Sequence, residues 1–459
     1  MYVVTLPASA ARNASAYSVA AMKAGADILE VRGDITPGLR PFASSIPRML
    51  SPRNGDLERL ETAGAAYLDL DLNEAGFTVG ASKLVISFHD YFSCPSREEL
   101  LETAARARDR GAEIVKIAVT PREPSELLML HHLQEELQWT GPCAILAMGP
   151  LAKANRLLSP FRNALTYTTV RKEDAAAPGQ LAIGEHRQLE GVSPPDLYGI
   201  FGGLDLQTAS PEIHDRLFKL QKRRARYAAF PGSDLKANFR ALAEMGLRGC
   251  SITAPYKNAI LPLLGEQDDD VVRCQAANTA VLQDDGSWKG YQTDTAGFLR
   301  GYPELRGLKK VTVVGSGGVV PAILLAGEKL GWAETRVCAR NGEALDSLRR
   351  TFKIEGASLD TLGDSAVDAI IWTLPLDRGE LKLPKPSSDE AIAVDLRYGQ
   401  DTLFMRLADG AGFMAKDGTA MLMEQALAQN ELFSKRKTTA ADRSVLAELA
   451  EEMGAADGE

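Results

Sequence analysis

The sequence predicts an α/β protein in which a (β/α) barrel is followed by two further α/β domains, the last of Rossmann type. Three observations lead to this prediction. Short apolar runs alternate with amphipathic stretches through residues 1–190, as repeated strand–helix units do. The same alternation resumes after a segment with paired prolines near residue 194. Finally, the β-branched run Val311–Val314 leads directly into a glycine-rich loop.

Length and composition narrow the class of protein. A chain of 459 residues exceeds one ordinary core, so two or three domains are expected. A net charge of -9 argues against a nucleic-acid partner, because phosphate backbones require a basic surface. No apolar run approaches the roughly 20 residues that cross a bilayer, so no membrane partner is expected.

The cysteines and histidines indicate a cytoplasmic protein without a metal. The five cysteines are scattered and form no C-x-x-C pair, which fits a reducing compartment and argues against a cysteine zinc site. The five histidines form no H-E-x-x-H motif. The first residues lack the basic start and long apolar stretch of a signal peptide, so we expect a cytoplasmic location.

The first 190 residues contain six candidate strands with polar residues at their ends. The strands are expected at Asp27–Val31, Ala66–Leu70, Leu84–His89, Glu113–Val119, Cys143–Met148 and Ala164–Thr168. Amphipathic helices are expected at Ser96–Arg108 and Glu123–Leu137. The residues that look functional at the strand ends are Glu30, Arg32, His89, Lys116 and Met148. Ligand groups at the carboxyl ends of successive parallel strands favour a barrel over a doubly wound sheet.

The rest of the chain divides into three predicted regions. GVSPPDL at Gly191–Leu197 reads as a linker. Strands are expected beyond it at Leu197–Phe201, Ala225–Phe230 and Gly249–Ile252. The predicted boundaries are a barrel at 1–190, a substrate domain at 197–300, a dinucleotide-binding domain at 301–415, and C-terminal helices that return to the substrate domain, plus a tail, at 416–459.

The glycine-rich loop predicts a dinucleotide cofactor. Glycines after a buried strand let the backbone approach a pyrophosphate at the N-terminus of the next helix. The residues expected to form this loop are Gly315, Ser316, Gly317 and Gly318. The next strand, Thr335–Ala339, ends in Arg340, which suits a 2′-phosphate, so NADP(H) is favoured. Glu343 lies close enough to keep NAD as an alternative, and Arg340 could equally be an ordinary solvated arginine.

Seven fragments in the C-terminal half occur in a specific order. They are TASP (208–211), SITAPYK (251–257), AANT (276–279), YQTDTAGF (291–298), GSGG (315–318), VDLRY (394–398) and DGTAMLMEQA (417–426). Together they resemble the shikimate dehydrogenase family over residues 197–434. The resemblance implies a catalytic pair, Lys257 and Asp294. A lysine ammonium held by a carboxylate can supply a proton and stabilise the developing alkoxide during ketone reduction.

The same resemblance assigns binding residues. Thr208 and Ser210 would bind the substrate carboxylate, with Tyr398 nearby. The ring hydroxyls would be bound by Thr253, Asn278 and Gln425. Thr373 and Gly418 would contact the cofactor. Four residues depart from the family pattern: Thr208 replaces a serine but keeps the hydroxyl, Ser251 replaces an asparagine, Ala339 replaces the asparagine before Arg340, and Ala344 replaces a basic residue. The loop at Thr373–Leu376 is also atypical of the family.

Fragments of the N-terminal half resemble type I 3-dehydroquinate dehydratase over residues 3–190. They are EVRGD (30–34), SFHDY (87–91), EIVKIAV (113–119), AMG followed by Arg156, and APGQ (177–180). The resemblance implies that Arg156 holds the substrate carboxylate, while Glu30, Arg32 and Gln180 orient hydroxyls and Met148 lines the pocket. Arg53, in SPRNGD, matches a family arginine and is expected to bind substrate, but the glutamate that follows this arginine in the family has no counterpart here. The region between Asp34 and Leu68 is short, so the barrel is expected either complete or with one unit trimmed.

The residues of this half suit a Schiff-base mechanism. Lys116 lies in an apolar strand, and burial lowers the pKa of a lysine from its reference value of about 10.4. The neutral amine could attack a substrate ketone, and the imine would acidify the adjacent C–H. His89 would take that proton and then help the hydroxyl leave as water.

The two resemblances together imply a bifunctional enzyme that dehydrates 3-dehydroquinate and reduces the product to shikimate with NADPH. The expected partners are the small-molecule substrates 3-dehydroquinate, 3-dehydroshikimate and shikimate. Two alternatives remain open. One is a quinate-type dehydrogenase with a weakened or inactive barrel, which Ser251 and the altered phosphate site favour. The other is a non-catalytic ligand sensor, which the presence of all four reacting residues argues against.

Overall fold

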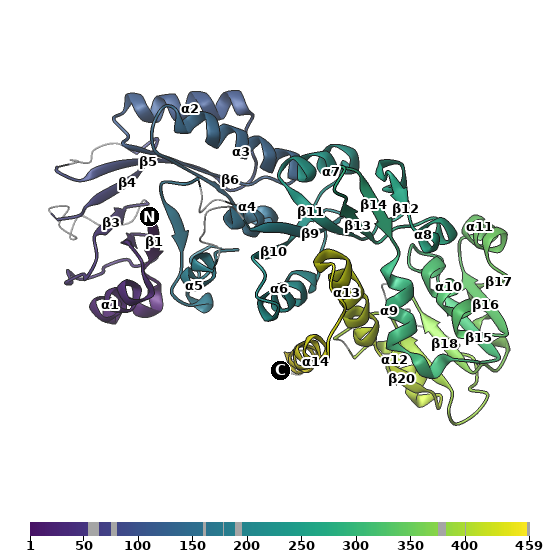
Figure 1. Cartoon of the computed structure of the whole chain (residues 1–459). Helices are drawn as coiled ribbons and strands as arrows, with labels where there is room; N and C mark the ends of the chain where they lie inside the picture. The colour runs from purple at the N-terminus through teal and green to yellow at the C-terminus, as the bar shows by residue number, and fades with distance from the viewer. Residues whose placement is uncertain are drawn as a thin grey trace. The chain divides into compact units, whose positions relative to one another are not determined.

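The structure is a computed structural model that describes residues 1–53, 64–74, 80–158, 162–177, 179–188, 195–374, 382–399 and 401–456. The chain divides into two compact units (Figure 1). The first unit comprises Met1–Asp196, Leu204–Leu206 and Ala228–Gly246. The second comprises Leu197–Gly203, Gln207–Tyr227 and Leu247–Glu459. Residues 191–194 of the predicted linker lie outside the described residues.

The first unit is built on an eight-stranded parallel sheet, which confirms the predicted α/β barrel. Its strand order is β7-β6-β5-β4-β3-β2-β1-β8. The strands are β1 (Tyr2–Thr5), β2 (Ile28–Arg32), β3 (Arg48–Ser51), β4 (Tyr67–Asp71), β5 (Lys83–Asp90), β6 (Ile114–Val119), β7 (Cys143–Ala147) and β8 (Thr166–Thr168). The strands β1 and β3 were not among those expected from the sequence. Both are four residues long, so they give little periodic signal.

Helices cover the barrel unevenly. The helices are η1 (Ala8–Asn13), α1 (Ala14–Ala24), α2 (Arg97–Asp109), α3 (Pro124–Gln138), η2 (Gly149–Leu151), α4 (Ala152–Leu158), η4 (Lys172–Asp174) and α5 (Ile183–Arg187). The link from β2 to β3, which is described throughout, contains no helix. Between β2 and β3 the barrel therefore lacks a helix, and this link belongs to the region between Asp34 and Leu68 that is short in the sequence.

The barrel is nearly closed between β7 and the segment before β8. The Ala164 amide donates to the Cys143 carbonyl at 2.8 Å. The Asn163 side chain continues this seam: its Oδ1 accepts from the Ile145 amide at 2.9 Å, and its Nδ2 donates to the Ile145 carbonyl at 3.1 Å. A buried asparagine thus satisfies backbone groups that a neighbouring strand would otherwise pair.

The second unit contains two sheets. The mixed sheet has the order β10-β9-β11-β13-β14-β12. Its strands are β9 (Asp196–Gly202), β10 (Ala225–Pro231), β11 (Leu247–Ile252), β12 (Glu266–Gln267), β13 (Thr279–Leu282) and β14 (Trp288–Tyr291). The helices near it in sequence are α6 (Ser210–Leu220), α7 (Leu235–Glu244), η5 (Leu261–Leu263), α8 (Asp269–Cys274), α9 (Thr293–Gly301) and η6 (Pro303–Leu305). Part of β10 and all of α7 cluster with the first unit.

The other sheet is parallel and of Rossmann type, with the order β17-β16-β15-β18-β19-β20. Its strands are β15 (Lys310–Val314), β16 (Glu334–Ala339), β17 (Glu355–Ser358), β18 (Ala369–Trp372), β19 (Ile392–Asp395) and β20 (Met414–Lys416). The helices are α10 (Val320–Leu330), α11 (Gly342–Thr351), η7 (Leu359–Asp364), α12 (Leu403–Gly410), α13 (Thr419–Ser434) and α14 (Ala440–Ala456). The strand order reverses at β15, where ligands of such sheets bind.

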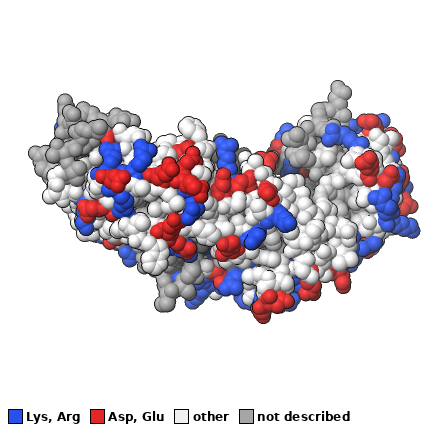
Figure 2. Space-filling model, turned by 90° about the horizontal axis from the view of Figure 1, so that it is seen from above, with Lys and Arg blue, Asp and Glu red and all other residues white. Residues whose placement is uncertain are grey.

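Helices α9 and α13 lie side by side (Figure 1). A Cβ on Gly297 would lie 2.6 Å from the Cβ of Gln425, so only glycine permits this approach. On the face seen in Figure 2, acidic and basic side chains lie intermingled. Within the described residues, no helix is long and apolar enough to cross a membrane.

Candidate active sites

The barrel interior changes from apolar to polar along its strands. Side chains two residues apart on a strand point to the same face. On β4 this face carries Tyr67, then Asp69 and Asp71, and on β6 it carries Ile114 and then Lys116. Tyr67 and Ile114 belong to an apolar cluster that also includes Val3, Ile28, Met49, Val85, Leu146 and Tyr167. The polar residues follow towards the carboxyl ends, where a barrel carries its site.

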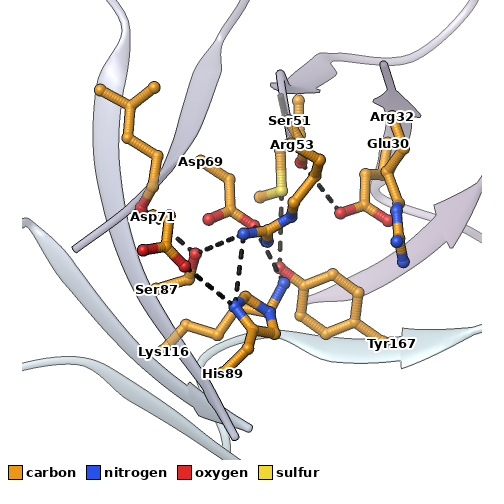
Figure 3. Close-up of polar contacts among 12 residues, drawn as sticks. Glu30, Arg32, Ser51, Arg53, Asp69, Asp71, Ser87, His89, Lys116 and Tyr167 are labelled. Atoms are coloured by element: carbon orange, nitrogen blue, oxygen red, sulfur yellow. Dashed lines mark hydrogen bonds and ion pairs between the residues drawn. The ribbon is translucent and has the colours of Figure 1, made fainter. Parts of the chain in front are cut away.

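Lys116 lies at the centre of this polar layer (Figure 3). Its Nζ donates to Asp69 Oδ2 at 2.9 Å and lies 4.1 Å from the centre of the Tyr167 ring. Arg53 Nη2 donates to the same Asp69 oxygen at 2.8 Å. Lys116 is 5% exposed and Asp69 is fully buried. The lysine, the arginine and the carboxylate therefore form one buried ion cluster.

Burial and neighbouring charges perturb these groups. Burial lowers the pKa of Lys116, with the Arg53 charge adding to the effect and the Asp69 charge opposing it. Burial alone would raise the pKa of the Asp69 carboxyl, but Lys116 and Arg53 outweigh it and hold that pKa at about 2. The carboxylate is thus charged at neutral pH, and the lysine loses its proton more readily than a lysine in water.

His89, at the end of β5, joins the cluster through Arg53. Its Nδ1 lies 3.4 Å from Arg53 Nη1 and 3.5 Å from Asp71 Oδ2. Arg53 Nη1 also donates to Ser87 Oγ at 2.9 Å. Burial lowers the pKa of His89, with Asp71 opposing, so the imidazole is neutral at neutral pH. A neutral imidazole in the same polar cluster as the lysine can act as a general base.

Glu30 and Arg32, which were also expected from the sequence, lie near this cluster (Figure 3). Glu30 is buried, and its carboxylate accepts from Thr5 Oγ1 at 2.6 Å and Ser51 Oγ at 3.0 Å. Arg32 pairs with Asp34 at 2.6 Å. Gln180 Nε2 donates to the Thr168 carbonyl at 3.2 Å.

Arg156 and Met148 come from the chain after β7. Arg156 lies on α4 and is 4% exposed, and burial lowers the pKa of its guanidinium to about 10. The group therefore keeps its charge at neutral pH. Met148 directly follows β7 and packs against the apolar cluster of the barrel. Their contact with substrate remains a prediction.

Four residues of this site were not predicted from the sequence: Asp69, Asp71, Ser87 and Tyr167. A signal was present, because YLDLD at 67–71 places two aspartates on one face of a strand whose other residues are apolar. Buried charges are nearly always paired, so this pattern indicates a cationic partner inside the barrel.

A second lysine–carboxylate pair lies in the second unit. Lys257 Nζ donates to Asp294 Oδ2 at 2.6 Å, with the two side chains 14% and 9% exposed. Asn278 Nδ2 donates to Asp294 Oδ1 at 2.7 Å, and Asn278 Oδ1 accepts from the Thr293 amide at 2.7 Å. Asp294 is placed by the first turn of α9, whose N-cap is Gln292. The sequence-predicted residues Lys257, Asn278 and Asp294 thus lie together.

The remaining predicted binding residues come from separate elements. Thr208 Oγ1 donates to Ser210 Oγ at 2.9 Å just before α6, so the two expected hydroxyls are adjacent. Thr253 follows β11, and its amide donates to the Phe201 carbonyl at 3.0 Å. Gln425 lies on α13 and Tyr398 follows β19. No hydrogen bond among the described residues links Tyr398 or Gln425 to the Lys257–Asp294 pair.

The glycine loop lies between β15 and α10. Gly315 has φ +121°, and a Cβ there would lie 2.2 Å from Thr373 Oγ1, so the loop can turn only at glycine. A Cβ on Gly317 would meet nothing within 4 Å. A Cβ on Gly318 would lie 3.8 Å from Lys257 Cδ, which places the loop beside the second lysine pair.

A cavity of about 230 Å³ adjoins this loop. Its lining residues are Gly315, Ser316, Cys338, Ala339, Arg340, Asn341, Leu359 and Leu374. Arg340 is exposed at its edge. Gly418 has a packing role, since a Cβ there would lie 2.2 Å from the Leu396 carbonyl oxygen. Within the described residues, no group of three His, Cys, Asp or Glu side chains could hold a metal.

Comparison with known proteins extends these observations. The family model for the shikimate dehydrogenase substrate binding domain matches residues 205–280. The shikimate dehydrogenase (NADP(+)) of Oleidesulfovibrio alaskensis is 30% identical over 256 residues, which cover 53% of this chain and 91% of that protein. The chain belongs to the shikimate dehydrogenase family. A solved shikimate dehydrogenase from Aquifex aeolicus is 25% identical with a TM-score of 0.50 over 56% of this chain and 97% of that one.

A second catalytic region precedes the shikimate dehydrogenase region in the sequence. The family model for type I 3-dehydroquinase matches residues 52–192. The bifunctional 3-dehydroquinate dehydratase/shikimate dehydrogenase of Arabidopsis thaliana is 27% identical over 472 residues, which cover 89% of this chain and 78% of that protein. The resemblances predicted from the sequence are therefore confirmed for both halves.

Ser251 departs from the shikimate dehydrogenase pattern, and its hydroxyl is occupied. It accepts from Tyr227 at 2.5 Å and donates to Gln429 Oε1 at 2.9 Å. Gln429 also contacts His214 at 3.2 Å and Thr279 at 3.2 Å. These side chains are buried. Ser251 therefore stabilises a buried polar network. It stands at a position where the family pattern has an asparagine.

Proposed function

We propose that this chain converts 3-dehydroquinate to 3-dehydroshikimate in the barrel and reduces 3-dehydroshikimate to shikimate in the second unit. The observation that supports this most strongly is the presence of two separate lysine sites. One lysine is buried in the barrel in the same polar cluster as His89 (Figure 3), and the other is paired with a carboxylate beside a glycine loop.

In the barrel, the neutral amine of Lys116 attacks the substrate ketone, and water leaves as the imine forms. His89 then removes the proton next to the imine carbon and returns it to the departing hydroxyl. Arg156 binds the substrate carboxylate, and the remaining polar side chains orient its hydroxyls. Release of 3-dehydroshikimate by water restores the lysine.

In the second unit, the Lys257 ammonium donates a proton to the oxygen of the reduced ketone. Asp294 holds this ammonium in place, and Asn278 holds Asp294. The Thr208 and Ser210 hydroxyls bind the carboxylate of the substrate. Because Lys257 and Asp294 are both mostly buried, their charges interact more strongly than they would in water.

The residues around the glycine loop fit a dinucleotide of the NADP(H) type. The open space above Gly317 allows a pyrophosphate to approach the backbone, and Arg340 at the edge of the cavity suits a 2′-phosphate. When bound, this cofactor supplies the hydride for the reduction. The NADP(+) specificity in the name of the Oleidesulfovibrio alaskensis relative supports the same choice.

A second candidate is a dehydrogenase that acts on quinate as well. Ser251 favours this candidate. Its hydroxyl is already hydrogen-bonded to Tyr227 and Gln429, so it offers a substrate less hydrogen bonding than an asparagine would. The same network leaves the Lys257–Asp294 pair intact, so the two candidates share their chemistry and differ in substrate.

Separate assays of the two half-reactions test the proposal. Dehydration is followed by product formation from 3-dehydroquinate without nucleotide, and reduction by oxidation of NADPH with 3-dehydroshikimate. Oxidation of shikimate and of quinate, with NADP⁺ and NAD⁺, decides between the candidates. Comparable kcat/KM for both acids would favour the second candidate, and no turnover in either half-reaction would contradict both.

A further inference from the structure

Lys116 shares its carboxylate partner with a second cation. Arg53 Nη2 and Lys116 Nζ donate to the same oxygen, Asp69 Oδ2, at 2.8 and 2.9 Å (Figure 3). Asp69 Oδ1 has no hydrogen-bond partner among the described residues. Two cations thus converge on one oxygen of a fully buried carboxylate.

Arg53 is held in this position from several sides. Its Nη1 donates to Ser87 Oγ at 2.9 Å, and its side chain is 10% exposed. Its backbone adopts φ +50°, a left-handed conformation that residues other than glycine rarely take. Such conformations persist where the surrounding structure fixes them, and they gather at functional sites.

A buried carboxylate that loses its partner is strongly destabilised. If Lys116 were the only partner of Asp69, releasing the lysine proton would leave that charge unpaired. Arginine does not deprotonate in proteins, so Arg53 remains a cation whatever happens to the lysine. We propose that Arg53 is a positioning residue that keeps Asp69 paired and thereby allows Lys116 to become the neutral, attacking amine. This inference rests on the proposed dehydratase function of the barrel.

The proton balance is simple. One N–H bond of the Lys116 ammonium breaks, and the proton passes to solvent water. The lone pair left on Nζ forms the bond to the ketone carbon. The C–O bond then breaks, and the oxygen departs as water with the two hydrogens that Nζ loses as the C=N bond forms. No atom is oxidised or reduced in these steps.

The direction of each charge effect can be stated. Among the described residues, the titratable and charged groups that act on Lys116 are Asp69, Glu30, His89 and Tyr167 on neighbouring strands, and Arg53, which follows β3. Removing the Arg53 charge leaves Asp69 to the ammonium alone, so Lys116 should lose its proton at higher pH. Removing the Asp69 charge leaves two neighbouring cations, so Lys116 should lose its proton at lower pH.

Carbamylation by potassium cyanate tests this without substrate, because an amine reacts with cyanate only in its neutral form. The rate at Lys116 is measured over a pH series by peptide mass spectrometry, with exposed Lys23 in the same protein as reference. The midpoint is the pH at which the carbamylation rate of Lys116 reaches half its maximum. Arg53→Gln should raise this midpoint by about one pH unit or more. Arg53→Lys, which keeps a cation, should bring it back towards the parent. Arg97→Gln, a change on the surface helix α2, should leave it unchanged.

An unchanged or lowered Lys116 midpoint in folded Arg53→Gln would overturn the proposal. Should that variant fail to fold, Asp69→Asn carries the test, since the proposal requires a lowered midpoint there and a raised one contradicts it. The readout needs no dehydration. A parent protein that neither dehydrates 3-dehydroquinate nor forms a borohydride adduct would overturn the proposed function instead.

Discussion

Replacing Asp294 by asparagine tests the second lysine site. The carboxylate accepts from Lys257 on one oxygen and from Asn278 on the other, at 2.6 and 2.7 Å. Both partners are donors, and an amide offers only one acceptor oxygen. Asparagine therefore keeps the shape but satisfies only one of the two, and the other faces an NH₂ group.

The expected loss of reduction rate in Asp294→Asn follows from the geometry of the pair. A full charge pair at 2.6 Å is worth at most roughly 6 kcal/mol at an effective dielectric constant of about 20. The retained amide hydrogen bond recovers part of this. Losing a positioned proton donor typically costs about 10²–10⁴ in rate, or roughly 3–5 kcal/mol. We expect kcat for 3-dehydroshikimate reduction to fall within that range.

The assay compares both half-reactions in Asp294→Asn, with Asp284→Asn as the matched control. Asp284 has a 99% exposed side chain in the same unit, so its replacement should change neither activity. Dehydration should stay within a few-fold of the parent in both variants. Folded Asp294→Asn with nearly the parent's reduction rate would refute the reasoning, as would equal loss of both half-reactions.

Three further predictions follow from the described contacts. Borohydride with 3-dehydroquinate should leave a covalent adduct on the Lys116 peptide, and Lys116→Ala should abolish both adduct and dehydration; an adduct elsewhere would refute the Schiff base. Arg340→Ala should raise the KM for NADPH much more than the KM for NADH. Arg350→Ala, a change at an exposed arginine, should not show this difference between the nucleotides. Equal losses for both nucleotides in Arg340→Ala would contradict the assignment. The Asp69 carboxyl, with a pKa of about 2, stabilises the fold fully above about pH 4 and loses this contribution as pH falls through about 2. Urea unfolding should therefore separate Asp69→Asn from the parent at neutral pH and not near pH 2; a constant difference would refute the ion cluster.

Much of the fold could be predicted because the apolar pattern determines it. Strands such as Glu113–Val119 are continuous apolar runs, and the structure places β6 at Ile114–Val119. Strand β3, with only four residues, was missed because it follows an irregular link without a helix. Because β3 was not predicted, it was also not evident from the sequence why Arg53, two residues after this strand, reaches the centre of the barrel.

The site could be predicted where one residue carries a recognisable pattern. Lys116 is a lysine within an apolar strand, and Lys257 lies in a specific motif. Asp69 and Asp71 were missed because their role depends on register: Asp71 pairs with Ser87 across β4 and β5, and Ser87 pairs with Lys116 across β5 and β6. Similarly, the network that occupies Ser251 joins β10, β11 and α13, which local sequence does not bring together.

The central claim is that one chain performs both reactions in sequence. The most direct measurement supplies the purified protein with 3-dehydroquinate and NADPH and identifies the products by NMR while NADPH oxidation is recorded. We expect shikimate, with one NADPH oxidised for each molecule formed. Unchanged 3-dehydroquinate would contradict the assignment of the barrel, and accumulated 3-dehydroshikimate with NADPH unused would contradict that of the second unit.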